Sequence, residues 1–498
     1  MAQHIRGGIK TAKRYPKAEI SLHFIIVGGG IAGLATAFAL SLVGHRVTVI
    51  EESDGRIQTN NGVTCPPNMS KILQDWGLQS WLDQVGGKVA NFRLTAAHSG
   101  DELGVVHMDT KYAGKIESDF FFLLYDDLYT LLRSLVDIEG VEVLLNRKVV
   151  DIDTHAVSVT LSGDSVQASL KADVIIGADG KDSLVRSVVN SGSFIKEVPT
   201  GSEPADPAGL VISSAVFQTK VLTEDPELAM LLEPHLWTLW CGNKYYATGA
   251  LCSPDLYYVV MFSEVSSNAT SAVEDIKNDW KEDLKYGTNK LKLDHIEHRK
   301  SESEARFHKL LDLAGDQLRS MRYDGFGSAY LENAVDDSGS VCLVGDAGHP
   351  IVPYSWHSAA LGVEDACTLL HLFAGIQRHD QIPRLLNAYE EIRQPRWENI
   401  LDAEKAYRTE LAMPPGPARD ARDQFFGELA RMNSTFEEED DEVVSEDVER
   451  LRMAWIKTMA AYNFDAREAV DDWFSKWGGI LHRTVDLSEG VEDDFKTK

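Results

Sequence analysis

Three glycines near the start of the chain have the spacing of a nucleotide-binding turn. Gly28, Gly30 and Gly33 follow the apolar run LHFIIV (22–27) and precede a stretch of small residues. Such glycines let the backbone approach a pyrophosphate, and the helix that follows offers it free N–H groups. Glu51 ends the next apolar run, at the distance where a carboxylate binds a ribose hydroxyl. Together these residues predict a dinucleotide site rather than a purely structural turn.

Two later apolar runs also end in an acid. One leads into Asp179-Gly180, and the other leads into Gly345-Asp346. A carboxylate at the end of a strand can accept hydrogen bonds from a chain of hydroxyl groups. FAD carries such a chain in its ribityl group, whereas NAD has none between its pyrophosphate and its nicotinamide ribose. The acids therefore favour FAD over NAD as the bound dinucleotide.

The elements expected around these residues form an α/β fold. Residues 22–52 read as a β-α-β unit with parallel strands. Aromatic-rich strands such as LWTLWCGNKYYATGALCSPDLYYVVMF (236–262) indicate an antiparallel sheet. We expect a doubly wound FAD-binding domain, an inserted antiparallel-sheet substrate domain and a helical C-terminal extension. Their expected boundaries are 21–190 and 331–400 for the FAD-binding domain, 191–330 for the sheet domain and 401–498 for the extension.

Composition excludes several classes of partner. The chain has 498 residues and a formal net charge of −28, which disfavours nucleic acid and anionic membranes. Its five cysteines are widely spaced, as buried free thiols in a reducing compartment would be. No secretory signal and no apolar run of about eighteen residues appears. We expect a cytoplasmic protein with no membrane span, either a monomer or a homodimer.

Other chemistries find little support in the sequence. The HIEH stretch (295–298) has no third ligand nearby and reads as a solvated face, so no metal site is expected. The sequence also lacks a Gly-x-Ser-x-Gly elbow and an HExxH helix, which disfavours a hydrolase.

Several segments resemble those of the single-component FAD-dependent aromatic hydroxylases, and of the salicylate hydroxylase-like branch in particular. They also follow one another in the same order as in that family. The resemblance covers about residues 22–400. It is carried by Gly28-Gly29-Gly30-Ile31-Ala32-Gly33 with Glu51, GVTCPPN (62–68), GADGKDSLVR (177–186), GDAGHPIVPY with AALGVEDA (345–366), and YEEIRQPRW (389–397).

The resemblance implies an FAD-dependent monooxygenase. NADH or NADPH would reduce the flavin transiently, and O2 would then yield a flavin hydroperoxide that oxygenates a small, electron-rich aromatic substrate. A phenolic acid is expected, specifically 4-hydroxybenzoate or a salicylate-like acid that loses CO2 to give a hydroquinone or catechol. Three alternatives remain open: a tailoring monooxygenase of a larger secondary metabolite, a non-oxygenating flavoprotein such as a reductase, and a nucleotide-binding module without catalysis.

The resemblance also implies roles for individual residues. Asp346 would contact the ribityl region, and Pro353 would lie beside the isoalloxazine ring, with Val63 on the other side. Backbone N–H groups at the start of a helix would face the pyrimidine end of the flavin and stabilise negative charge there. The candidates for these groups are Ser358, Ala359 and Ala360.

Four positions depart from the family pattern. His357-Ser358 replaces a common Gln-Gly, and Tyr125 stands where relatives carry an FAD-binding arginine. His357 is a candidate for contacting or deprotonating the substrate, or for packing the loop. Tyr245 occupies a position where relatives often carry a substrate-contacting histidine. It is expected either to contact the substrate or to be a core aromatic residue.

Overall fold

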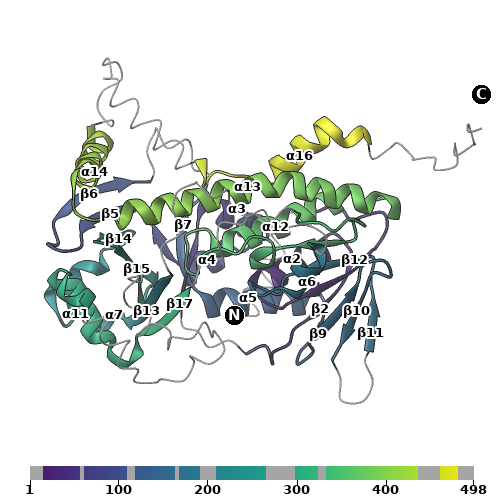
Figure 1. Ribbon diagram of the computed structural model, residues 1–498, viewed down its shortest axis with the longest axis horizontal. Coiled ribbons are helices and arrows are strands. Elements are labelled where there is room, and N and C mark those ends of the chain that lie inside the picture. Colours follow the sequence, from purple (N-terminus) through teal and green to yellow (C-terminus); the bar gives the residue numbers. More distant parts are fainter. Residues whose placement is uncertain are drawn as a thin grey trace, which may run out of the picture.

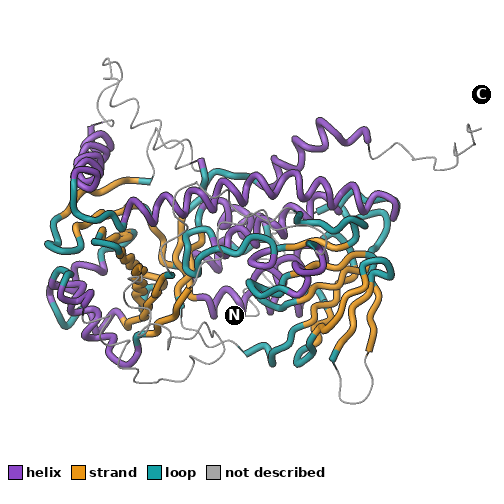
Figure 2. The backbone as a smooth tube through the Cα atoms, in the orientation of Figure 1, coloured by secondary structure: helices purple, strands orange, loops and turns teal. Residues whose placement is uncertain are grey.

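The computed structural model describes residues 15–56, 61–108, 118–162, 168–190, 209–264, 298–323, 333–435 and 460–480. The elements form two halves, one around a parallel sheet and one around a larger, mostly antiparallel sheet (Figure 1). A long helix, α13 (Ile382–Leu411), runs across both halves. Figure 2 shows the same division, with helices covering the parallel sheet and strands dominating the other half.

The parallel sheet has five strands in the order β18-β12-β1-β2-β8, and every neighbouring pair is parallel. Helix α2 (Ile31–Leu42) packs between α12 (Ser358–Phe373) and α5 (Tyr125–Ile138). Strands covered in this way are apolar along most of their length. The doubly wound α/β fold expected from the sequence is confirmed. Its strands are β1 (His23–Val27), β2 (Arg46–Ile50), β8 (Glu142–Leu144), β12 (Val174–Gly177) and β18 (Val341–Leu343).

The second half contains a seven-stranded sheet in the order β17-β13-β16-β15-β14-β5-β6. Its pairs are antiparallel except for β14 with β5. Strands β5 and β6 come from a part of the chain that the sequence had assigned to the FAD-binding domain, so the sheet extends beyond the expected range 191–330. The strands are β5 (Asn91–Ala96), β6 (Glu102–His107), β13 (Leu210–Gln218), β14 (Leu236–Cys241), β15 (Tyr245–Ser253), β16 (Leu256–Glu264) and β17 (Arg319–Tyr323).

The two faces of this sheet pack against different parts of the chain. One face, which includes Tyr245, packs against α11 (Ala305–Ala314). The other face, which includes Tyr246 and Phe262, packs against Val352 and other residues near the start of α12. Because side chains alternate along a strand, neighbouring residues belong to opposite faces. The second face is therefore the one turned toward the parallel-sheet half.

Smaller elements complete the fold. Two three-stranded sheets consist of β3 (Gly62–Cys65), β4 (Gly87–Val89) and β7 (Phe120–Leu124), and of β9 (Val149–Asp153), β10 (Ser158–Leu161) and β11 (Ala168–Lys171). The remaining helices are α3 (Pro67–Asp75), α4 (Gln79–Val85), α6 (Leu184–Val189), α7 (Thr219–Leu222), α8 (Pro226–Ala229), α14 (Pro417–Thr435) and α16 (Ala466–Trp477). Within the described part of the chain, none of the helices has the length and apolar character of a membrane span.

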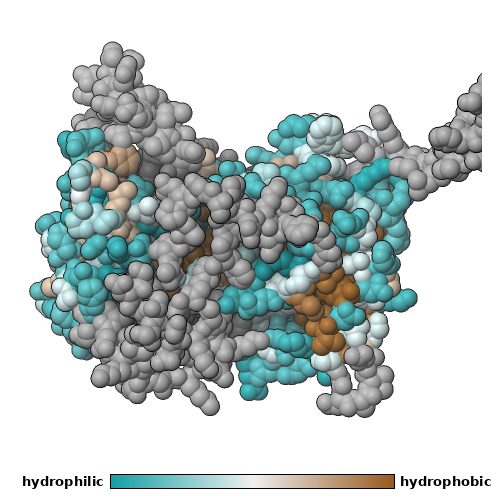
Figure 3. Space-filling view, in the orientation of Figure 1, coloured by the Kyte–Doolittle hydropathy of each residue, from teal (hydrophilic) through white to brown (hydrophobic). Residues whose placement is uncertain are grey.

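The described residues on the face shown in Figure 3 are mostly hydrophilic, as the acidic composition suggests. A hydrophobic patch lies on this face at the lower right, over the half that holds the parallel sheet. The five cysteines are all buried and free, as the sequence predicted.

Candidate functional site

The glycine turn after β1 is shaped for close approach of the backbone. Gly28 has φ +108°, and a Cβ atom there would lie 2.2 Å from a carbonyl oxygen just after β12. A Cβ at Gly33 would lie 2.1 Å from the Gly28 carbonyl oxygen, whereas a Cβ at Gly30 would meet only open space. Gly30 precedes α2 without a side-chain cap. The first N–H groups of α2, those of Ile31 and Ala32, are therefore available to a phosphate.

Glu51 lies against this turn. Its Oε2 accepts a hydrogen bond from the Gly29 N–H at 2.7 Å, and its Oε1 accepts one from the Ser53 N–H at 2.8 Å. Both bonds hold the carboxylate at the end of β2. The ribose contact predicted for Glu51 remains a prediction, and the position of the carboxylate beside the turn is compatible with it.

Asp346, although distant in sequence, belongs to a turn that packs against the same glycine-rich segment. It lies in the 3-10 turn η4 (Gly345–Ala347), directly after β18. Gly345 has φ +58°, and a Cβ atom there would lie 2.6 Å from the Ala32 Cβ, so η4 packs against the start of α2. No described residue donates a hydrogen bond to the Asp346 carboxylate, and burial raises its pKa against the effect of nearby cationic groups. A partly buried carboxylate that lacks a donor fits the ribityl hydroxyl groups of FAD.

The phenol of Tyr125 lies near the carboxylates of Asp346 and Glu51. It is the first residue of α5, and burial raises its pKa well above the usual range. The nearby carboxylates of Asp346 and Glu51 raise that pKa further, so the hydroxyl stays protonated and can donate a hydrogen bond. The sequence marked Tyr125 only as the replacement of an arginine. Its closeness to both acids could not be seen there, because it depends on how α5 packs.

The carboxylate of Asp179 forms hydrogen bonds within its own loop. Its carboxylate accepts hydrogen bonds from the Ser183 hydroxyl at 2.5 Å and from the Leu184 N–H at 2.7 Å, and so caps α6. Gly180 has φ +78°, which favours glycine at that position. Arg186 then links this loop to η4 by donating to the carbonyl oxygens of Gly180 and Asp346. These contacts make Asp179 and Gly180 part of the support for Asp346, and direct contact with a cofactor remains a prediction.

A buried ion cluster lies beneath η4. Asp365 Oδ2 accepts a hydrogen bond from the Gly345 N–H at 2.9 Å and lies 2.7 Å from His349 Nε2. Arg393 joins the cluster through Asp365 Oδ1 and Glu364 Oε2, both at 2.7 Å. Burial alone would raise the pKa of both carboxyl groups, but their cationic neighbours outweigh it and lower each pKa to about 2. The cluster therefore holds the backbone that presents Asp346.

The Pro353 loop connects the flavin site to the large sheet. Tyr354, directly after Pro353, has φ +63°, which is uncommon for a residue with a side chain. Its hydroxyl accepts a hydrogen bond from Asn61 Nδ2 at 2.7 Å, while the Thr64 hydroxyl donates to the Trp356 carbonyl at 2.7 Å. These contacts fix the loop against β3, the strand that contains Val63.

The start of α12 offers fewer N–H groups than expected. The Ser358 N–H donates to the Ser355 carbonyl at 3.2 Å, so it is already engaged. Ala359 and Ala360 follow in the first turn of the helix, and no side chain caps it. Of the three N–H groups predicted to face the flavin, these two are the ones available.

His357 is not among the residues that line the pocket described below. Its Nδ1 lies 2.8 Å from Glu404 Oε1, and its backbone N–H donates to the same oxygen at 3.1 Å. The ring stacks on Tyr462 with centroids 4.9 Å apart. His357 is fully buried in these contacts with α13 and the C-terminal segment. The geometry favours the packing role that the sequence had left open for it.

Tyr245 belongs to the sheet face that packs on α11. Its hydroxyl contacts Ser303 Oγ at 3.0 Å, and the Arg299 guanidinium lies 5.1 Å from its ring centroid. Tyr246 points the other way and lines a pocket between the sheet and α13. The structure therefore brings Tyr246, rather than the Tyr245 chosen from sequence, to the pocket. Nothing in the local sequence distinguishes these two adjacent tyrosines.

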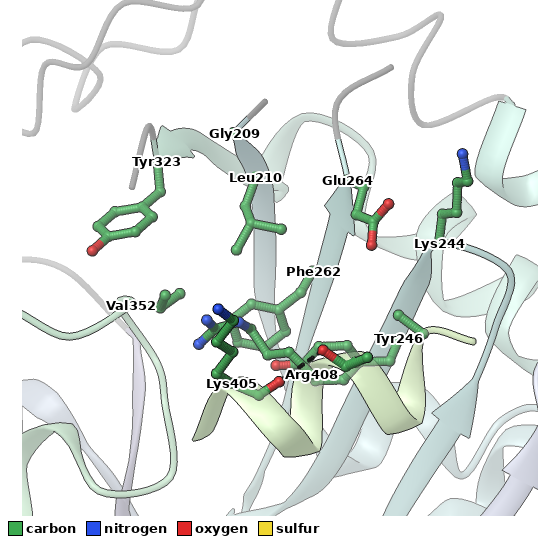
Figure 4. A pocket seen from close by; sticks show the side chains of 12 residues that line it. Gly209, Leu210, Lys244, Tyr246, Phe262, Glu264, Tyr323, Val352, Lys405 and Arg408 are labelled. Carbon is green, nitrogen blue, oxygen red and sulfur yellow. Dashed lines mark hydrogen bonds between the residues drawn. The ribbon is translucent and has the colours of Figure 1, made fainter. Parts of the chain in front are cut away.

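The pocket lies beside the Pro353 loop. Val352, which directly precedes Pro353, is one of its lining residues, and Figure 4 shows Lys405 and Arg408 reaching into it from α13. The other lining residues are Gly209, Leu210, Lys244, Tyr246, Phe262, Glu264, Tyr323, Thr409 and Ala412. Among the residues described, no group of three His, Cys, Asp or Glu side chains could hold a metal ion. Most of the HIEH stretch lies outside the described residues.

Comparisons with known proteins agree with this geometry. Residues 21–215 match the family model for an FAD binding domain. FAD-dependent monooxygenase OpS4 of Beauveria bassiana (strain ARSEF 2860) is 26% identical over 455 residues, which cover 90% of this chain and 96% of the relative. The protein is an FAD-dependent monooxygenase.

Two further similarities describe this monooxygenase. Hispidin-3-hydroxylase of Neonothopanus nambi is 27% identical over 421 residues, which cover 82% of this chain and 94% of the relative. A substrate complex of salicylate hydroxylase superposes with a TM-score of 0.62 at 21% identity, covering 90% of this chain and 98% of that structure. The second similarity shows the shared fold. The first similarity is distant in sequence but spans most of both chains.

Proposed function

We propose that this monooxygenase is a tailoring enzyme that oxygenates an electron-rich ring of a metabolite larger than a benzoate. The observation that carries the proposal is the aromatic face of the large sheet. Trp237, Tyr246, Tyr258 and Phe262 share that face, and Trp356 of the Pro353 loop packs against it. Tyr246 and Phe262 line the pocket and would offer an apolar contact to an aromatic substrate, whereas Trp237 and Tyr258 are buried in the core. The similarity to a hydroxylase named for hispidin also supports a substrate of this kind.

Different residues of the chain would bind the cofactor, stabilise charge and exclude water. FAD supplies electron transfer from a reduced nicotinamide and the activation of O2. The glycine turn would bind its pyrophosphate, Glu51 its ribose, and Asp346 its ribityl chain. The N–H groups of Ala359 and Ala360, at the positive end of α12, would stabilise negative charge that develops next to them. The aromatic face of the sheet would keep water from the reacting ring.

Two side chains near the Pro353 loop are poorly suited to remove a substrate proton. His357 is held by Glu404 and is not among the residues that line the pocket. Burial raises the pKa of Tyr354 to about 12, so this phenol is neutral near pH 7 and acts as a donor or acceptor of hydrogen bonds. We infer that the acidity of the substrate's own phenol or enol makes its ring carbon nucleophilic. Hydroxylation, dearomatising hydroxylation and epoxidation are all compatible with that activation.

A second candidate is the decarboxylating hydroxylation of 4-hydroxybenzoate or a salicylate-like acid, in the salicylate hydroxylase-like branch. One observation favours it: Lys405 and Arg408 line the pocket and would attract a carboxylate. In that reaction the ring carbon that bears the carboxylate is hydroxylated and CO2 leaves.

One assay distinguishes these functions. The holoenzyme is mixed with NADH or NADPH and with a panel of hydroxypyrones, polyphenols, 4-hydroxybenzoate and salicylate. Reductant oxidation, O2 uptake, CO2 release and product mass are then followed. The proposal predicts that a larger phenol or enol stimulates oxidation and gains one oxygen atom. A benzoate that releases CO2 would favour the second candidate, and reductant consumption without an oxygenated product would contradict both.

A further inference from the structure

The floor of the pocket is a pair of stacked rings. Tyr246 of β15 and Phe262 of β16 are direct cross-strand neighbours. Their ring centroids are 4.6 Å apart and their planes differ by 10°. Because the two rings face each other, they present an apolar surface of ring edges to the pocket. The floor is therefore suited to an apolar part of a ligand.

The wall of the pocket is cationic. Lys405 and Arg408 are three residues apart on α13, so both side chains project from one face of the helix, as Figure 4 shows. Lys244, from the turn between β14 and β15, lies at the rim. The lining residues include one acid, Glu264. In a chain with a net charge of −28, this local excess of positive charge favours an anionic ligand.

The floor also offers one unused donor. Tyr246 is 6% exposed, and its hydroxyl forms no hydrogen bond with any described residue. Burial raises the pKa of Tyr246 above its usual range, and the nearby Arg408 only partly opposes this. The hydroxyl is therefore protonated. Because Tyr246 lines the pocket, a ligand that accepts a hydrogen bond from this hydroxyl would be stabilised there.

We infer that this pocket binds the anionic end of the substrate, a carboxylate or an ionised enol. Lys405 and Arg408 pair with the anion, Tyr246 donates a hydrogen bond to it, and the adjoining apolar part of the substrate contacts Tyr246 and Phe262. The pocket has a volume of about 50 Å³, which is enough for such an end group but not for a polycyclic metabolite. The rest of the substrate extends past Val352 toward the Pro353 loop. This inference rests on the proposed function and narrows its substrate class.

The test compares an acid with its uncharged ester. The probes are 4-hydroxycinnamate and its methyl ester, titrated into the FAD-loaded enzyme, with binding followed by the change in flavin absorbance. We expect the acid to bind about ten-fold more tightly than the ester, as one charge-assisted hydrogen bond allows. Arg408→Met and Lys405→Met should each remove most of that preference while leaving ester binding unchanged. Arg384→Met is the matched control, since it lies near the opposite end of α13.

Three results would overturn the inference. The first is equal binding of acid and ester by the wild-type enzyme, or no binding of either. The second is an acid preference that survives in both variants. The third is a change only in KM for NADH or NADPH, which would assign the two cations to the phosphates of the nicotinamide nucleotide. A failure of the proposed function is distinguishable, because it would appear as a lack of oxygenated product in the wild-type enzyme.

Discussion

Replacement of Arg393 by methionine tests the structural basis of the flavin site. Arg393 is fully buried and bridges Asp365 and Glu364, and Asp365 in turn holds the Gly345 N–H of η4. Methionine keeps much of the apolar stem but removes the charge. Two carboxylates then lose a cation inside the core, and η4 loses part of its support. We expect both lower stability and weaker binding of FAD.

The magnitude follows from the cost of leaving a buried charge without its partner. Breaking a buried ion pair in this way costs about 3–5 kcal/mol. For a domain of a few hundred residues, about 2–4 °C of Tm corresponds to each kcal/mol, so a loss of about 6–20 °C is expected. His349 and Arg396 remain beside Asp365 and Glu364, respectively, which favours the lower part of that range.

The effect also depends on pH in a defined direction. Both folded-state carboxyl pKa values are lowered to about 2, from ordinary values of 4.5 for Glu364 and 3.8 for Asp365. Their contribution to wild-type stability is therefore complete above about pH 4.5 and is lost as the pH falls toward 2. The penalty of Arg393→Met should be largest at neutral pH and should shrink below about pH 4, where protonation removes the unpaired charges.

The assay is thermal unfolding between pH 3.5 and 7.5, with FAD released on unfolding as a second readout. Arg384→Met, a partly exposed position on the same helix, should change stability by no more than about 0.5 kcal/mol. Two results would contradict this expectation: Arg393→Met behaving like this control at pH 7, or a penalty of the same size at pH 3.5 and pH 7.

Three other substitutions have expected outcomes. Asp346→Ala should lose FAD, measured as flavin per polypeptide after gel filtration, because the carboxylate beside the glycine turn is removed; full flavin content would exclude a cofactor role. Tyr125→Phe should weaken FAD binding several-fold in a fluorescence titration while leaving Tm within about 2 °C, since it removes one donor and keeps the ring; unchanged affinity would show that the hydroxyl does not contact the cofactor. Tyr246→Phe should raise KM for the substrate, whereas Tyr245→Phe should mainly lower Tm through the lost contact with Ser303; the reverse pattern would assign the catalytic pocket to the other sheet face.

The glycine turn and the Asp346 turn could be predicted because their requirements are local. Gly28 and Gly345 both need positive φ, and close backbone contacts leave no room for a Cβ atom at Gly33. Backbone requirements of this kind can be recognised from the type and spacing of residues in a short stretch of sequence. The order of these stretches along the chain was then enough to predict the parallel sheet.

The substrate side of the site was less accessible from sequence because its contacts join distant residues. His357 is oriented by Glu404, which lies 47 residues away. Which tyrosine of Tyr245-Tyr246 faces the pocket depends on the register of β15 with β16, and a one-residue difference moves a side chain to the other face. The cations of α13 reach the pocket only because that helix spans both halves of the molecule. None of these relations is encoded in a local motif.

As a monooxygenase, the protein inserts oxygen from O2 into an organic substrate with the help of FAD. The most direct measurement supplies ¹⁸O2 to the FAD-loaded enzyme with NADH or NADPH and the panel of phenols, enols and hydroxybenzoates, and analyses the products by mass spectrometry. The account predicts one product that carries a single ¹⁸O atom, formed only when reductant is present. A product without the label, or oxidation of the reductant that leaves every compound unchanged and yields only reduced oxygen, would contradict it.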